Sequence, residues 1–131
     1  MGKLLGLDFG ETYVGLALTD GEKTIAFPRA VIRRENDITL AKTIKKMCTE
    51  EGVERIIVGL PLDEDDGETD RSRRIRSFAE KLSSIIETPI SFQDEAYSST
   101  EAESLMGKKK PATRRDDIAA QKILERYLGN L

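Results

Sequence analysis

The 131-residue sequence contains no histidine and only one cysteine, Cys48. Without histidine the chain can form neither a catalytic triad that uses an imidazole base nor a zinc site of the HEXXH type. With one cysteine it can form no disulfide within the chain and no cysteine-rich zinc site. Demanding chemistry must therefore depend on carboxylates, hydroxyls, lysine or arginine, and these side chains suit a hard, oxygen-preferring metal ion.

Aromatic residues are also scarce, at 5% of the chain with no tryptophan, so we expect an aliphatic core. No apolar run is long enough for a membrane span or a secretory signal, and we expect a cytoplasmic protein with no membrane partner. Charged residues make up 34% of the chain, but their signs nearly balance to a net charge of −3. Binding of nucleic acid would therefore need a local basic patch.

The hydrophobic pattern predicts a single α/β domain over residues 1–131. It begins with three strands in an antiparallel meander, at Leu4–Asp8, Tyr13–Thr19 and Thr24–Arg34. Pro28 marks an edge or a bulge in the third of these strands. The period then changes to that of a helix, which begins after Asn36 or Asp37 and stops at Gly52.

Strands and helices alternate along the rest of the chain. A central strand over 53–61 is followed by an amphipathic helix from Asp70 to Ile86, a short strand at Pro89–Glu95, a helix that starts at Ser98, and a last helix at Asp116–Leu128. This order predicts a mixed five-stranded sheet with helices on its faces.

Carboxylates stand at the ends of three elements that are far apart in the sequence. Asp8 ends the first strand, and Asp94 and Glu95 end a strand near the edge where α/β sheets place their sites. Asp116 opens the last helix on its apolar side, where Asp117 competes with it for any role. Each group has an ordinary alternative as a turn or helix cap. Together they suit Mg²⁺ or Mn²⁺, two of which can clamp the reacting oxygens of a phosphodiester.

Basic residues form two clusters that could contact phosphates without reading sequence. The ordinary alternative for such a charge run is a solvated face. The candidate nucleic-acid-binding residues are Arg71, Arg74, Lys108, Lys109, Lys110, Arg114 and Arg115. The acidic loop over residues 63–66 should repel phosphate, so a substrate path should avoid it.

Four segments, LDFGETYVG, VGLPLDEDDG, DEAYSSTEAE and DDIAAQKILERYL, occur in an order that resembles the bacterial YqgF/RuvX family. Members of that family are described as Holliday-junction-resolvase-like proteins and pre-16S ribosomal RNA nucleases. The resemblance runs from Leu4 to Leu128 and implies a ribonuclease H-like fold with a metal-dependent nuclease site. It implies that Asp8, Glu95 and Asp116 are catalytic. Asp94 joins these three as a metal ligand in what the resemblance implies, around a pair of Mg²⁺ or Mn²⁺ ions.

The sequence departs from the family at Ala96, where an arginine usually follows the Asp-Glu pair. From the resemblance we expect a nuclease for structured nucleic acid, which matures the 5′ end of the 16S rRNA precursor. The alternatives are a Holliday junction resolvase that acts on branched DNA and a non-catalytic nucleic-acid-binding module in rRNA processing or transcription. We expect a monomer by default, with a homodimer left open.

Overall fold

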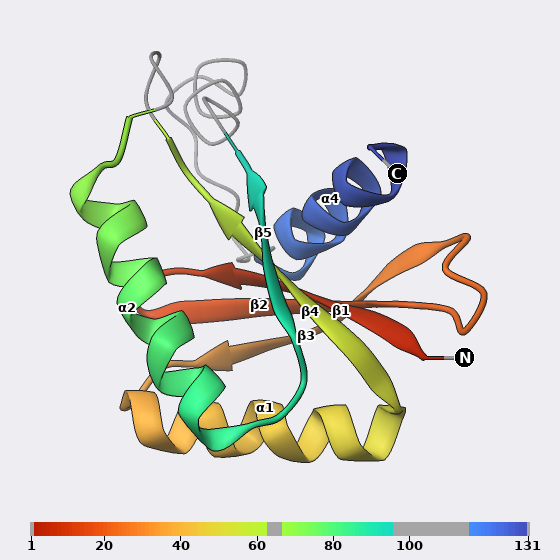
Figure 1. Ribbon diagram of the computed structural model, residues 1–131, viewed down its shortest axis with the longest axis horizontal. Helices are drawn as coiled ribbons and strands as arrows, with labels where there is room; N and C mark the ends of the chain where they lie inside the picture. Colours follow the sequence, from red (N-terminus) through yellow and green to blue (C-terminus); the bar gives the residue numbers. More distant parts are fainter. Residues whose placement is uncertain (1, 63–66, 96–115, 131) are drawn as a thin grey trace.

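The computed structural model describes residues 2–62, 67–95 and 116–130, and its centre is a five-stranded mixed sheet (Figure 1). The strands lie in the order β3-β2-β1-β4-β5, with β1 antiparallel to β2 and parallel to β4. Their bounds are β1 Lys3–Phe9, β2 Tyr13–Thr19, β3 Ala26–Arg33, β4 Val53–Leu60 and β5 Ile90–Asp94. The predicted meander and the mixed sheet are both confirmed.

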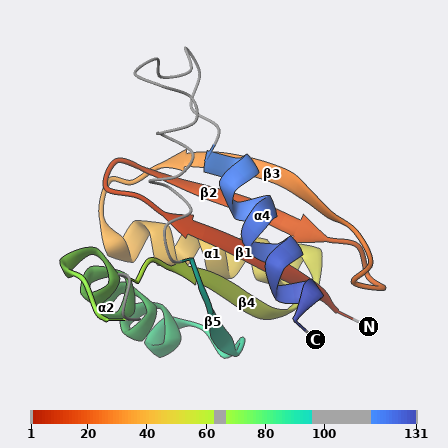
Figure 2. The same cartoon turned by 90° about the horizontal axis from the view of Figure 1, so that it is seen from above.

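In the described parts of the chain, three helices pack against the sheet, with α4 on the face opposite α1 (Figure 2). They are α1 Asp37–Glu51, α2 Asp70–Ile85 and α4 Asp116–Gly129. The Asn36 side chain caps α1 by accepting a hydrogen bond from the Thr39 amide, and Gly52 ends the helix in the left-handed region at φ 70°. The helix expected to start at Ser98 lies outside the described residues.

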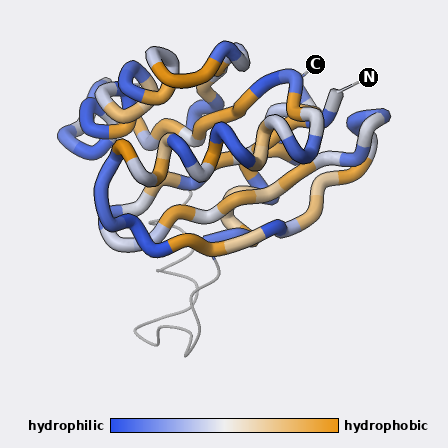
Figure 3. Tube along the Cα trace, turned by 90° about the horizontal axis from the view of Figure 1, so that it is seen from below, coloured by the Kyte–Doolittle hydropathy of each residue, from blue (hydrophilic) through white to orange (hydrophobic). Residues whose placement is uncertain are grey.

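Two hydrophobic clusters lie on opposite faces of the sheet. The larger joins β1, β2 and β4 to α1 and α2, and the smaller lies beneath α4. The hydropathy of the chain follows this division, with apolar residues along the strands and polar residues along the connections (Figure 3). None of the described helices is both long and apolar enough to cross a membrane.

Strand β3 is an edge strand and contains the irregularity that Pro28 predicts. Its pairing with β2 shifts between Leu16 and Ala17, which lie opposite Ala30 and Pro28 respectively. Proline has no amide hydrogen to give to a ladder, and an edge or bulge position tolerates that loss. The prediction from the sequence is confirmed.

Asp37, at the start of α1, ties β3 and α2 together. Its carboxylate accepts hydrogen bonds from Arg34 Nη2 at 3.1 Å and from Lys81 Nζ at 3.0 Å, and its side chain is only 18% exposed. Burial alone would raise the pKa of Asp37, but the hydrogen bonds from Lys81 and Arg34 outweigh burial and hold its pKa below the usual value. The ionised form of Asp37 therefore stabilises the packing of the two helices.

Replacing this carboxylate should make stability less dependent on pH. We expect Asp37→Asn to lower the free energy of unfolding by about 1–2 kcal/mol at pH 7, because charged hydrogen bonds are lost. Since the folded pKa is depressed, the contribution is complete above the unfolded pKa of about 3.9 and disappears as pH falls through the folded pKa. Urea unfolding of both proteins from pH 7 to pH 3 should show the difference shrinking toward acid. A difference that stays constant over this range, or one that exposed Glu22→Gln reproduces, would contradict this role.

Candidate active site

Asp8 lies on the face of the sheet that α4 covers. Successive side chains of a strand point to opposite faces. Leu7 and Phe9 belong to the cluster beneath α1 and α2, whereas Leu4 belongs to the cluster beneath α4. The half-buried Asp8 shares the face of Leu4, at the carboxyl end of β1.

Helix α4 packs directly on the backbone of the sheet, because glycines occupy the positions beneath it. A Cβ atom at Gly15 would lie 1.9 Å from the carbonyl oxygen of Asp116. A Cβ at Gly6 would lie 2.6 Å from Leu124 Cγ, and one at Gly59 would lie 2.4 Å from Ile123 Cδ1. At Gly15 and Gly6 the close atoms include backbone carbonyl oxygens of α4, so a side chain at either position would push the helix off the sheet.

This close packing brings Asp116 beside Asp8. Gly15 is the direct antiparallel partner of Asp8, and Asp116 is the first residue of α4. Because the backbone of Asp116 lies against Gly15, two of the three predicted carboxylate positions meet at the same end of the sheet. The sequence places them 108 positions apart, a separation read directly from the residue numbers.

Glu95 follows directly after β5, the strand on the far side of β4 from β1, and shares the face of Asp8. Its amide donates to the Leu60 carbonyl at 2.9 Å, and its Cγ lies 3.4 Å from the Cβ position of Gly59. Its side chain is 11% exposed and forms an ion pair with Arg126 of α4. Arg126 Nη1 lies 3.3 Å from Glu95 Oε2. Arg126 therefore neutralises Glu95 and holds it against α4, an arrangement that sequence reasoning missed.

Asp94 lies apart from these carboxylates. It is exposed, and alternation along β5 gives it the face of Phe92, which packs in the cluster beneath α1 and α2. The guanidinium carbon of Arg76, on α2, lies 5.0 Å from the centre of the Phe92 ring. The hydrogen bond with Glu68 is the main cause that raises the pKa of Arg76, and the charge of Asp94 adds a smaller effect in the same direction. Of the adjacent acidic pair, Glu95 is the residue that shares a face with Asp8.

The chemistry of this donor set fits a hard divalent ion, because Asp8, Glu95 and Asp116 all offer carboxylate oxygens. Among residues 2–62, 67–95 and 116–130, no three acidic or cysteine side chains are close enough to share one ion as they lie. The three positions therefore share a face and an edge, and joint coordination requires their side chains to converge. The assignment of metal ligands, including Asp94, stays a prediction.

Only some of the predicted phosphate-binding residues lie in the described parts of the chain. Arg71 and Arg74 lie at the start of α2 and line a shallow hollow with Gly10 and Glu11. Arg34, which sequence reasoning did not select, lines the same hollow from the end of β3. The candidates Lys108, Lys109, Lys110, Arg114 and Arg115 lie outside the described residues, as does Ala96.

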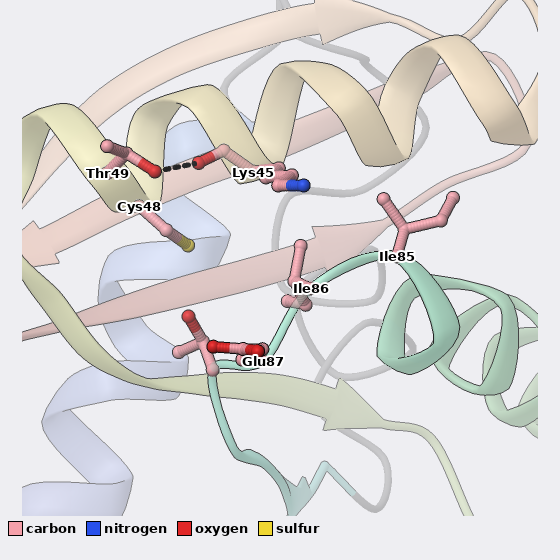
Figure 4. Close-up of a pocket in the computed structure, with 7 residues that line it drawn as sticks. Lys45, Cys48, Thr49, Ile85, Ile86 and Glu87 are labelled. Atoms are coloured by element: carbon pink, nitrogen blue, oxygen red, sulfur yellow. Dashed lines mark hydrogen bonds between the residues drawn. The ribbon is translucent and has the colours of Figure 1, made fainter.

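A separate cavity of about 510 Å³ lies at the opposite edge of the sheet, near the carboxyl ends of α1 and α2 (Figure 4). Its lining includes Lys45, Cys48 and Glu87. Burial raises the pKa of the Cys48 thiol, although a hydrogen bond with Thr88 acts in the other direction. A protonated, buried thiol is a poor nucleophile, so Cys48 is poorly suited to act as one in this cavity.

The family described as RuvX, Holliday junction resolvase, matches residues 2–130. This chain belongs to the RuvX family. Its curated relatives include proteins named "Putative pre-16S rRNA nuclease" from Cereibacter sphaeroides, Paramagnetospirillum magneticum and Maridesulfovibrio salexigens. The Cereibacter protein is 36% identical over 99% of this chain and 84% of its own length. The corresponding values are 36%, 98% and 86% for Paramagnetospirillum, and 34%, 97% and 98% for Maridesulfovibrio.

Solved structures give the same architecture for this RuvX chain. The chain is similar to T. thermophilus RuvC in complex with a Holliday junction substrate, with a TM-score of 0.61 and 12% identity over 99% of this chain and 95% of that one. The fowlpox virus Holliday junction resolvase gives a TM-score of 0.56 and 14% identity over 98% and 99%. At these identities the likeness shows the fold, and the expected ribonuclease H-like architecture is confirmed.

The glycine beneath the start of α4 gives a direct test of how this RuvX site is assembled. We expect Gly15→Ala to destabilise the protein by more than about 3 kcal/mol, the upper end of ordinary overpacking, because its Cβ would collide with backbone rather than with a flexible side chain. Urea unfolding measures the loss. Gly129→Ala is the matched control, since no described atom outside its own helix backbone and chain neighbours lies within 4 Å of its Cβ position. Equal stability of the two variants would show that α4 can move without cost.

Proposed function

We propose that this RuvX protein is a metal-dependent nuclease that hydrolyses phosphodiester bonds in structured RNA, with the 16S rRNA precursor as its substrate. Relatives across nearly the whole chain carry the name of a pre-16S rRNA nuclease. The observation that carries the chemistry is the meeting of Asp8 and Asp116, which the packing of α4 on Gly15 enforces. Two acidic residues that are brought together from remote elements at a strand end suit a metal-assisted site.

In this proposal Asp8 and Asp116 hold the ion, and Glu95 completes its shell. Mg²⁺ or Mn²⁺, as one ion or a pair, supplies Lewis acidity for attack on the phosphorus. Arg126 offsets the charge of Glu95, so three carboxylates can share one face with less mutual repulsion. The chain has no histidine, which leaves oxygen-bearing side chains and solvent to manage the protons of the reaction.

Branched DNA is the second candidate substrate. The family description names a Holliday junction resolvase, and the similar solved structures include resolvases with junction DNA. A resolvase must cut two strands, which favours two copies of the site. The described residues supply one site per chain, so a monomer that cuts RNA remains our proposal.

Removing the carboxylate at the end of β1 should abolish cutting while leaving the fold intact. We expect Asp8→Asn to lower the cleavage rate at least about 100-fold. Mutating a residue that only hydrogen-bonds to a metal ligand already lowers metal affinity or activity about 10–100-fold. The assay uses end-labelled precursor 16S RNA and a four-way DNA junction, each with Mn²⁺ or with EDTA. Exposed Glu80→Gln on α2 removes the same charge at a distance and should retain activity.

The same assay separates the alternatives. Cleavage that needs the ion and disappears in Asp8→Asn supports a carboxylate nuclease, and the preferred probe identifies its substrate. Glu95→Gln should reduce the rate more than Asp94→Asn, because Glu95 shares the face of Asp8. If neither probe is cut while both are bound tightly by wild type and Asp8→Asn, the protein is a non-catalytic binding module.

A further inference from the structure

Three arginines converge at the turn that follows Asp8. Arg34 arrives from the end of β3, and Arg71 and Arg74 arrive from the first turns of α2. Together they line a shallow hollow beside Phe9 and Gly10, the two residues that come directly after Asp8. We refer to Arg34, Arg71 and Arg74 as the arginine cluster.

Arg34 is held in place before any ligand arrives. Its guanidinium carbon lies 4.5 Å from the centre of the Phe9 ring, and its Nη2 donates to Asp37 at 3.1 Å. Its Nη1 lies 3.5 Å from the carbonyl oxygen of Glu11. Phe9 is itself stacked on Phe78 of α2, with ring centroids 4.6 Å apart. A guanidinium fixed in this way loses little freedom when it binds an anion.

The positive charge of the cluster is only partly balanced. Arg74 Nη2 lies 3.3 Å from Glu11 Oε1, but both side chains are largely exposed, at 58% and 77%. Such surface pairs contribute little and exchange readily with solvent. Arg71 is half-buried and forms no ion pair within the described parts of the chain. Glu11 thus holds the position that an external anion would take.

We propose that the arginine cluster binds a backbone phosphate of the nucleic acid, with Glu11 as an internal anion that the phosphate displaces. This inference rests on the proposed function, and it identifies where the strand lies beyond the cleaved bond. Guanidinium groups match phosphate oxygens through paired hydrogen bonds. The site contacts the backbone and reads no base, so it positions the strand beside Asp8 without selecting a sequence.

Binding measured in EDTA tests this site without requiring catalysis. The probes are a fluorescein-labelled hairpin RNA from the 5′ end of precursor 16S rRNA and a labelled four-way DNA junction, titrated by anisotropy at several KCl concentrations. Arg71→Gln and Arg74→Gln should each weaken binding and reduce the salt slope by about one. Arg73→Gln is the matched control, because Arg73 belongs to the same helix turn but pairs with Asp70 outside the hollow.

A second variant in the same assay should gain affinity, a result that misfolding cannot produce. Glu11→Gln should strengthen binding by up to about fivefold, because the phosphate no longer has to displace the Glu11 carboxylate from Arg74. This factor corresponds to the contribution of one surface ion pair. Exposed Glu80→Gln changes the net charge equally and should have a smaller effect. The proposal is overturned if Arg71 and Arg74 variants behave like Arg73→Gln, if Glu11→Gln matches Glu80→Gln, or if wild type binds neither probe. Unchanged binding together with ion-dependent cleavage would reject this site and leave the nuclease function standing.

Discussion

The arrangement of this protein depends on the direct contact between helix α4 and the backbone of the sheet. Glycines at three positions on neighbouring strands remove the side chains that would otherwise separate the two layers, and Gly15 is the most constrained of them. Protein interiors are too densely packed to absorb an extra methyl group against a carbonyl oxygen. The same contact that closes the smaller core therefore also fixes Asp116 beside Asp8, so that packing and site geometry share one cause.

Alternation along two strands divides the chemistry between the two faces of the sheet. On β1, Asp8 points to the face of α4, while Phe9 packs against α2 and supports the guanidinium of Arg34. At the end of β5, Glu95 points to α4, while the preceding Asp94 lies toward α2. A shift of one residue in either register would exchange these roles. Both strands are pinned by parallel pairing with β4, which is buried along most of its length.

The sequence was sufficient for most of the fold, because each element carries its own local signal. The strand over Tyr13–Thr19 and the start of α4 at Asp116 were predicted with the bounds that the structure shows. Of the two expected cap candidates, Asn36 and Asp37, the structure selects Asn36, and Gly52 ends the helix as expected. For the site, the sequence predicted only that carboxylates at the ends of three elements lie at one edge of the sheet. Which residue of an adjacent acidic pair faces α4 depends on the register at the end of a five-residue strand, and strand ends are the least certain part of any pattern.

Contacts between remote residues account for what the sequence could not reveal. Arg34 approaches the turn at Glu11 because β3 returns beside β2. Arg126, which pairs with Glu95, lies 31 positions later in the chain, on α4. The arginine cluster also reduces an electrostatic repulsion at the site. Carboxylates that gather for a cation repel a polyanionic strand, and the net charge of −3 adds to this repulsion. Placing guanidinium groups on the other side of the same turn supplies attraction within reach of the strand while the ion-binding face remains acidic.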